Sequence, residues 1–111
     1  MFSIIIPTFN NLEYLKLCLN SIKKNSKFHH EIIVHINEGV DGTFDFLKNN
    51  SYKFSYSKKN EGVCVAFNQA EKLATNKYIV LGHDDMYFCP DWDRVFSNEL
   101  KLINENGDFF I

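Results

Sequence analysis

The stretch FSIIIP, residues 2–7, is a short apolar run with three consecutive isoleucines that ends at a proline. A run of this kind, without polar alternation, is typical of a strand buried on both faces, as in parallel sheets. Three further runs resemble it: EIIVHIN at residues 31–37, FSYS at 54–57 and YIVL at 78–81. We expect all four to be strands, with residues 54–57, the weakest of them, near an edge of the sheet.

Helical periodicity separates these runs. Asn10 and Glu13 have the spacing of a capping box, which predicts that the first helix begins at Asn10. Asp41-Gly42-Thr43 indicates a turn and cap, followed by a short helix over residues 44–49. Apolar stripes predict a third helix over 63–74 and a fourth that begins near Pro90 and ends at Gly107. Their members are Val63, Ala66, Phe67, Ala70, Leu73 and Ala74 in the third helix, and Trp92, Val95, Phe96, Leu100 and Ile103 in the fourth. Strand and helix therefore alternate, and we predict an α/β fold with a mainly parallel sheet flanked by helices.

Composition narrows the class of protein. The chain has 111 residues, of which 45% are hydrophobic, and a net charge of −2. This composition excludes a disordered chain, and the weak acidity argues against a nucleic-acid partner, which requires clustered cations. No run approaches the length of a membrane span, and the three cysteines (Cys18, Cys64 and Cys89) form no CxxC pair. We expect reduced thiols and a cytoplasmic location, with the inner face of a membrane as the alternative.

The end of the sequence is unusual. Residues 108–111, DFFI, begin a fifth apolar run, and the sequence stops inside it. We expect a fragment of a longer protein, truncated in its fifth strand, whose open sheet edge offers a surface for self-association.

Polar residues follow the predicted strands, and ligands of open α/β sheets bind beyond the carboxyl ends of the strands. Asp84 and Asp85 come directly after the fourth run. Adjacent carboxylates repel each other, and a divalent cation such as Mg²⁺ or Mn²⁺ relieves this repulsion. A helix cap or a solvated turn is the alternative for both residues. His83 either joins such a site or only packs, while a zinc site of His83 with Cys89 matches no standard spacing.

Asn60 and Gly62 precede the third predicted helix, and Asn68 lies on that helix away from its apolar face. One interpretation is a helix that lines a ligand pocket. The other is simple turn formation by Asn60 and Gly62, and the residues leave both open.

Together these motifs resemble glycosyltransferase family 2 in order and spacing, over nearly the whole chain. The segments that carry the resemblance are SIIIPTFN at residues 3–10, Tyr14-Leu15, Leu19-x-Ser21-Ile22, EIIV at 31–34, Asp41-Gly42-Thr43, Asn60-x-Gly62 with Asn68, YIVL at 78–81 with Asp84-Asp85, and Pro90-Asp91.

The resemblance implies a GT-A fold in which residues 1–111 bind a nucleotide-diphosphate sugar, foremost a UDP-sugar. It assigns Mn²⁺ or Mg²⁺ to Asp85 with Asp84. The metal would stabilise the departing diphosphate while an acceptor hydroxyl attacks the anomeric carbon with inversion. The positions that it assigns to the nucleotide sugar are Pro7, Thr8, Phe9, Asn37, Asn60, Gly62, Asn68 and Asp84.

The chain departs from the family pattern at three positions. Asn37 replaces an Asp that contacts uracil, Phe67 stands where many relatives carry a cation, and Gly82 replaces the first Asp of the usual Asp-x-Asp. The catalytic base and the acceptor-binding region correspond to positions beyond Ile111. We therefore expect this chain to bind a nucleotide sugar but to transfer the sugar poorly by itself.

Two other functions remain open from the sequence. A non-catalytic binding module would use the same cleft, or the open sheet edge, to hold a partner. A response-regulator-like domain also places acidic residues at strand ends, but Asn37 does not supply the phosphorylatable Asp that it needs. Metal-dependent nucleotide binding separates the enzyme from the binding module.

Overall fold

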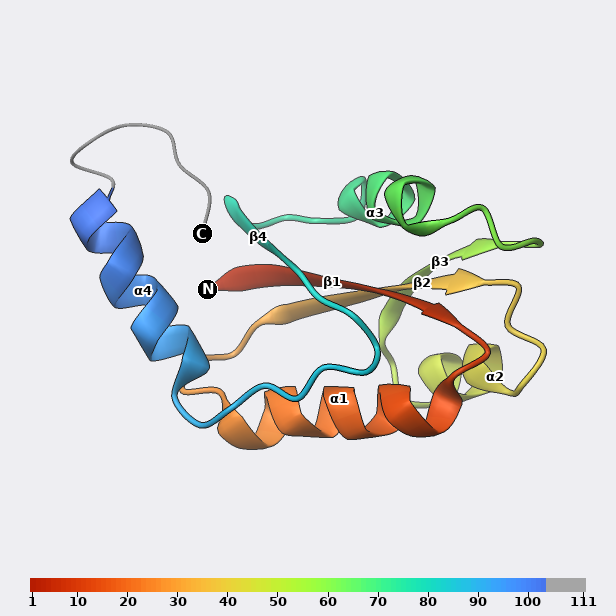
Figure 1. Cartoon of the computed structure of the whole chain (residues 1–111), viewed down its shortest axis with the longest axis horizontal. Coiled ribbons are helices and arrows are strands. Elements are labelled where there is room, and N and C mark those ends of the chain that lie inside the picture. The colour runs from red at the N-terminus through yellow and green to blue at the C-terminus, as the bar shows by residue number, and fades with distance from the viewer. Residues whose placement is uncertain (104–111) are drawn as a thin grey trace.

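A computed structural model of the chain describes residues 1–103 and shows a parallel sheet with helices on both faces (Figure 1). Its four strands are ordered β3-β2-β1-β4, so the predicted edge position of residues 54–57 is confirmed. The predicted fifth strand and the helix end at Gly107 lie outside the described residues. In chain order the elements are β1 (Phe2–Phe9), α1 (Leu12–Asn25), β2 (Glu31–Asn37), α2 (Thr43–Asn49), β3 (Lys53–Ser57), α3 (Val63–Glu71), β4 (Tyr78–Leu81) and α4 (Trp92–Ile103).

β1 is buried on both faces because its alternate side chains enter two different cores. Ile4 and Ile6 pack into the larger core, which contains the apolar residues of α1 together with Leu47 of α2. Ile5 points the other way and packs with Ala70 of α3. Figure 1 shows the same division, with α1 and α2 below the sheet and α3 above it. An uninterrupted apolar run is what such a strand requires.

The start of α1 differs from the prediction. The helix begins at Leu12, and it has no local side-chain cap from the predicted box of Asn10 and Glu13. Instead, Asp41 Oδ2 accepts a hydrogen bond from the Leu12 N–H at 2.9 Å. Asn10 Oδ1 accepts the Val40 N–H at 2.8 Å, which ties the two loops together. The cap comes from a residue that is distant in sequence, which local spacing cannot indicate.

The predicted stripes of α3 and α4 are only partly correct. Ala66 and Ala70 of α3 are buried, whereas Val63 is 48% exposed because it borders a cleft, and Leu73 lies beyond the end of the helix. In α4, Val95 is exposed, and the helix begins after Pro90. Among the helices that the structure describes, none has the length and apolar character needed to cross a membrane.

A buried carboxylate fastens α4 to the loop between α1 and β2. Asp93 accepts hydrogen bonds from the N–H groups of Lys27 and Phe28 at 3.0 and 2.8 Å, and from His30 Nε2 at 2.8 Å. His30 Nδ1 in turn accepts the Phe2 N–H at 3.0 Å, so a neutral imidazole with its proton on Nε2 satisfies both contacts. Burial alone would raise the pKa of Asp93, but these hydrogen bonds outweigh it and hold that pKa below its ordinary value.

Candidate functional site

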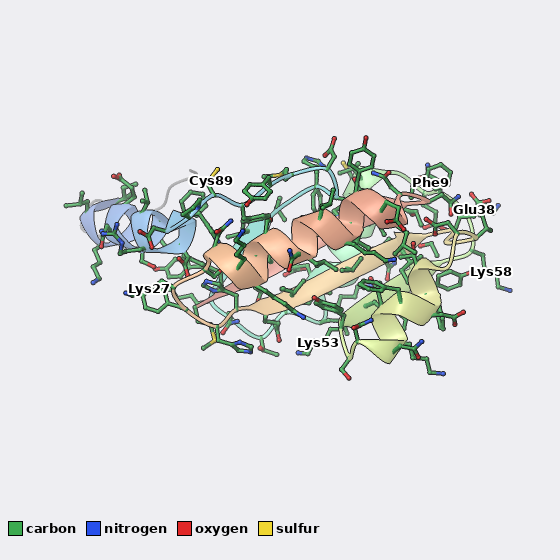
Figure 2. All side chains as sticks on the ribbon, turned by 90° about the horizontal axis from the view of Figure 1, so that it is seen from below. Phe9, Lys27, Glu38, Lys53, Lys58 and Cys89 are labelled. Atoms are coloured by element: carbon green, nitrogen blue, oxygen red, sulfur yellow. The ribbon has the colours of Figure 1, made fainter. Side chains whose placement is uncertain are left out.

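The carboxyl ends of β1, β2 and β4 border a shallow cleft of about 350 Å³. Figure 2 shows Phe9, Glu38 and Lys58, which end or follow the first three strands, at the same end of the molecule, away from Lys27. All of the positions predicted to hold the nucleotide sugar line this cleft except Asn68. The lining residues are Pro7, Thr8, Phe9, Asn11, Asn37, Asn60, Gly62, Val63, His83 and Asp84.

Asp84 enters the cleft in a fixed position. The Thr8 hydroxyl, which is buried on β1, donates a hydrogen bond to Asp84 Oδ2 at 2.9 Å. The backbone before Asp84 is anchored separately, because the Gly82 N–H donates to the Ile5 carbonyl at 2.8 Å. The Cys18 thiol, below this segment, also donates to the His83 carbonyl at 3.5 Å. The half-buried carboxylate is therefore presented on a rigid support.

Asp85 differs from its neighbour. Its side chain is exposed, lies outside the cleft lining and makes no hydrogen bond or ion pair with the other described residues. Neither carboxylate accepts an N–H of a described helix, so neither is a helix cap there, but both residues lie in a turn in which the Met86 N–H donates to the His83 carbonyl at 3.2 Å. Burial, followed by the negative charges of Asp84 and Asp85, raises the pKa of the Cys18 thiol to about 12.

Two carboxylates are a small donor set for a metal. Within residues 1–103, no group of three or more His, Cys, Asp or Glu side chains is placed to hold an ion. Two hard oxygen donors beside an open cleft nevertheless fit Mg²⁺ or Mn²⁺, which usually keep several waters and share phosphate oxygens of a substrate. The Asp pair therefore fits a divalent ion that binds together with a phosphorylated ligand.

The loop before α3 combines both interpretations made from its sequence. Asn60 Oδ1 accepts the Gly62 N–H at 3.0 Å, and Gly62 has a φ of 88°, so this is a turn. The same two residues also line the cleft. Asn37, buried at the end of β2, accepts the Glu61 N–H through Oδ1 at 3.3 Å. The Asn37 side chain also contacts His35: burial lowers the pKa of that imidazole, and a hydrogen bond with Asn37 partly opposes the shift.

Several predicted or conspicuous polar residues lie elsewhere. Asn68 is exposed on α3 and does not line the cleft. His35 is structural, because its two ring nitrogens contact the Ser55 and Ser57 hydroxyls at 2.7 and 2.9 Å. Asn11, which the sequence interpretation omitted, does line the cleft. It follows the end of β1, so the rule that ligands bind at strand ends would have found it.

The sequence of the chain matches the family described as Glycosyl transferase family 2 over residues 3–106. The chain belongs to glycosyltransferase family 2. It is 31% identical to an uncharacterized glycosyltransferase of Mycoplasma genitalium, in an alignment that covers 100% of this chain and 43% of the relative. It is 30% identical to the putative teichuronic acid biosynthesis glycosyltransferase TuaG of Bacillus subtilis, over 77% of this chain and 36% of TuaG. The chain thus spans less than half the length of these relatives.

Solved structures confirm the fold. S. aureus TarS 1–349 in complex with UDP superposes with a TM-score of 0.76 at 23% identity, over 99% of this chain and 38% of the TarS 1–349 chain. The mannosyltransferase PcManGT from Pyrobaculum calidifontis, in complex with GDP-Man and Mn²⁺, gives a TM-score of 0.76 at 20% identity, over 92% of this chain and 32% of PcManGT. The four-stranded parallel sheet flanked by helices is therefore the GT-A fold that the sequence predicted.

Two of the departures from the family pattern can be located in the structure. Gly82 is buried, and a Cβ built on it would lie in ordinary van der Waals contact with Ile6 at 3.5 Å and Phe88 at 3.6 Å. At a second departure, the Phe67 ring lies edge-on to the His83 ring, with 6.3 Å between centroids, so Phe67 packs where a cation was expected.

A larger cavity of about 660 Å³ lies at the opposite, amino-terminal end of the strands. Its most conspicuous polar residue is Glu31, which is already satisfied: its carboxylate accepts hydrogen bonds from Ser3 at 2.7 Å and from the Thr75 hydroxyl at 2.8 Å. Burial alone would raise the pKa of Glu31, but hydrogen bonds from Lys53, Ser3 and Thr75 lower it to about 2. Since Glu31 has its partners within the protein, we place the candidate site at the smaller cleft.

Proposed function

We propose that this chain is the donor-binding part of a metal-dependent, inverting glycosyltransferase of hexosyltransferase type. The enzyme would transfer a sugar from a nucleotide-diphosphate sugar to a hydroxyl acceptor in glycan or polysaccharide synthesis. The observation that carries the proposal is the placement of Asp84 in the cleft, held by Thr8, beside Asp85, whose carboxylate has no partner among residues 1–103. We propose a cytoplasmic location, at the inner face of a membrane if the acceptor is lipid-linked.

The cleft offers suitable partners for a nucleoside. Pro7, Phe9 and Val63 provide apolar contacts at its border, and Phe9 is 46% exposed, so its ring is available to a base. Asn37 is buried among the lining residues, and its side-chain amide can both donate and accept hydrogen bonds. We propose a UDP-sugar as the donor, in keeping with the UDP complex of TarS.

The diphosphate would lie toward the Asp pair. We propose that Asp85, with Asp84, holds Mn²⁺ or Mg²⁺, and the Mn²⁺ in the PcManGT complex supports this choice. When bound, such an ion stabilises the negative charge on the leaving nucleoside diphosphate. Because the described part of the chain contributes only two carboxylates, metal and nucleotide should bind cooperatively, each supplying ligands or charge that the other needs.

We assign no catalytic base within residues 1–111. Inversion requires a carboxylate or a similar group that takes the proton of the acceptor hydroxyl, and the family resemblance places that group beyond Ile111. A longer version of the chain would contain the acceptor region and the base. We therefore propose that its turnover exceeds that of the present chain by more than about tenfold.

An exposed apolar edge favours a second candidate function, a module that binds a partner chain. β4 is an edge strand of the described sheet, and its Ile79 and Leu81 side chains are 37% and 56% exposed. Such an edge offers unpaired backbone groups to another strand. A protein with this function would show a size that increases with concentration and would be indifferent to nucleotide and metal.

Calorimetric titration with UDP, GDP and dTDP, each with and without Mn²⁺, tests the proposed function. We expect one nucleotide, UDP, to bind only when Mn²⁺ is present, because the Asp pair repels an uncompensated diphosphate. Metal-independent binding of all three nucleotides, or no binding by any, would contradict the proposal. Sedimentation of the same samples at two concentrations then distinguishes the partner-binding module.

A further inference from the structure

We infer that Thr8 is a positioning residue that fixes the Asp84 carboxylate for the metal-bound diphosphate, an inference that rests on the proposed function. The family resemblance places Thr8 among the residues that contact the nucleotide. The structure instead directs its hydroxyl at Asp84 Oδ2, 2.9 Å away.

Thr8 is suited to hold another side chain in place. It lies near the end of β1, where it pairs with Ile36 of β2, and only 2% of its surface is exposed. A β-branched side chain on a strand has few accessible χ1 rotamers, so the direction of its hydroxyl varies little. Asp84 lies in the loop after β4 and has no other side-chain hydrogen bond to a described residue. Thr8 is therefore the group that determines the orientation of this carboxylate.

The contact is not needed to hold the loop itself. The Gly82 N–H already binds the Ile5 carbonyl, and the Cys18 thiol binds the His83 carbonyl. These two contacts tie the segment to β1 and to α1 whether or not Thr8 carries a hydroxyl. The Thr8 bond therefore acts on the side chain of Asp84 rather than on the backbone.

The consequence for binding is specific. With Oδ2 engaged by Thr8, Asp84 presents Oδ1 as its free oxygen, whereas Asp85 has both oxygens free. A partner that orients a metal-binding carboxylate typically changes metal affinity by about 10- to 100-fold. Loss of the Thr8 hydroxyl should therefore leave the fold intact and lower the affinity for the metal ion.

Two substitutions separate positioning from packing. Thr8→Val removes the hydroxyl and keeps the shape, while Thr8→Ser keeps the hydroxyl. Thr43→Val is a matched control, because buried Thr43 donates to Asp41 Oδ1 at 2.6 Å, a similar Thr–Asp bond outside the cleft lining. In each protein, NMR couplings report the χ1 rotamer of Asp84 without metal, and electron paramagnetic resonance counts free Mn²⁺ in the presence of UDP.

We expect a single Asp84 rotamer in the unsubstituted chain, Thr8→Ser and Thr43→Val, and rotamer averaging in Thr8→Val. We expect Mn²⁺ affinity to fall about 10- to 100-fold in Thr8→Val alone. A single Asp84 χ1 rotamer in Thr8→Val, or an Mn²⁺ affinity of Thr8→Val equal to that of the unsubstituted chain, would overturn the inference. If the unsubstituted chain binds no Mn²⁺ with UDP, the proposed function fails, and the metal-free rotamer measurement still decides whether Thr8 positions Asp84.

Discussion

Replacing Asp93 with alanine should lower the free energy of unfolding by about 3 kcal/mol or more, because each of the three donors that it leaves unsatisfied costs about 1–3 kcal/mol. The substitution leaves the N–H groups of Lys27 and Phe28 and the Nε2–H of His30 without their acceptor. Since domains of this size are stable by about 5–15 kcal/mol, the variant should unfold at a much lower urea concentration. Urea unfolding followed by circular dichroism measures the change.

Glu99→Ala provides the control for this substitution. Glu99 is an exposed acidic residue on the same helix, α4, and its loss should change stability by less than about 0.5 kcal/mol. The stabilisation by Asp93 also depends on pH. Because folding lowers the pKa of Asp93, its carboxylate stabilises the fold above the ordinary pKa of 3.8, and this stabilisation is lost as the pH falls below that value. Equal stabilities for Asp93→Ala and Glu99→Ala would show that the buried network contributes little.

Asp85→Ala should weaken metal-dependent nucleotide binding by about 100-fold or more, because it removes a ligand itself, whereas loss of a supporting residue already costs about 10- to 100-fold. The same substitution should leave stability within about 0.5 kcal/mol, since Asp85 is exposed and makes no hydrogen bond to the described residues. Calorimetric titration with UDP and Mn²⁺, together with urea unfolding, measures both quantities.

Asp45→Ala is the matched control for Asp85→Ala, because it removes one exposed carboxylate from α2, outside the cleft lining. It corrects for the change in net charge. Nucleotide binding reduced equally by both substitutions would mean that Asp85 acts only through general electrostatics. Loss of cooperative unfolding in Asp85→Ala alone would instead assign Asp85 a structural role.

The strands could be predicted from the sequence because burial leaves a local signature. β1 and β2 lie between helices on both faces, so their sequences are nearly continuous apolar runs. The cap of α1 and the anchor of α4 could not be predicted. Asp41 caps α1 at Leu12, 29 residues away in the sequence, and Asp93 contacts His30, 63 residues away. No local sequence pattern indicates contacts between residues so far apart in the chain.

The candidate site was predictable to the extent that it follows strand ends. Thr8, Asn37 and Asp84 come at the carboxyl ends of three strands, and the parallel topology brings those ends together. Asn68 lies outside the cleft. The sequence could not show this, because helical periodicity predicts that Asn68 faces away from the core but not which neighbour it faces. The difference between a held Asp84 and a free Asp85 depends on the Thr8 hydrogen bond, which only the structure shows.

The location of a bound metal–nucleotide complex tests the central claim most directly. UDP with a trace of Mn²⁺, titrated into ¹⁵N-labelled chain, broadens amide signals close to the bound paramagnetic ion. We predict that the signals of Thr8, Gly62 and Asp84 at the cleft disappear first, while those of Glu31 and Thr75 at the amino-terminal cavity persist. Broadening that begins at Glu31 and Thr75, or that affects both ends of the sheet equally, would contradict a donor site at the carboxyl ends of the strands.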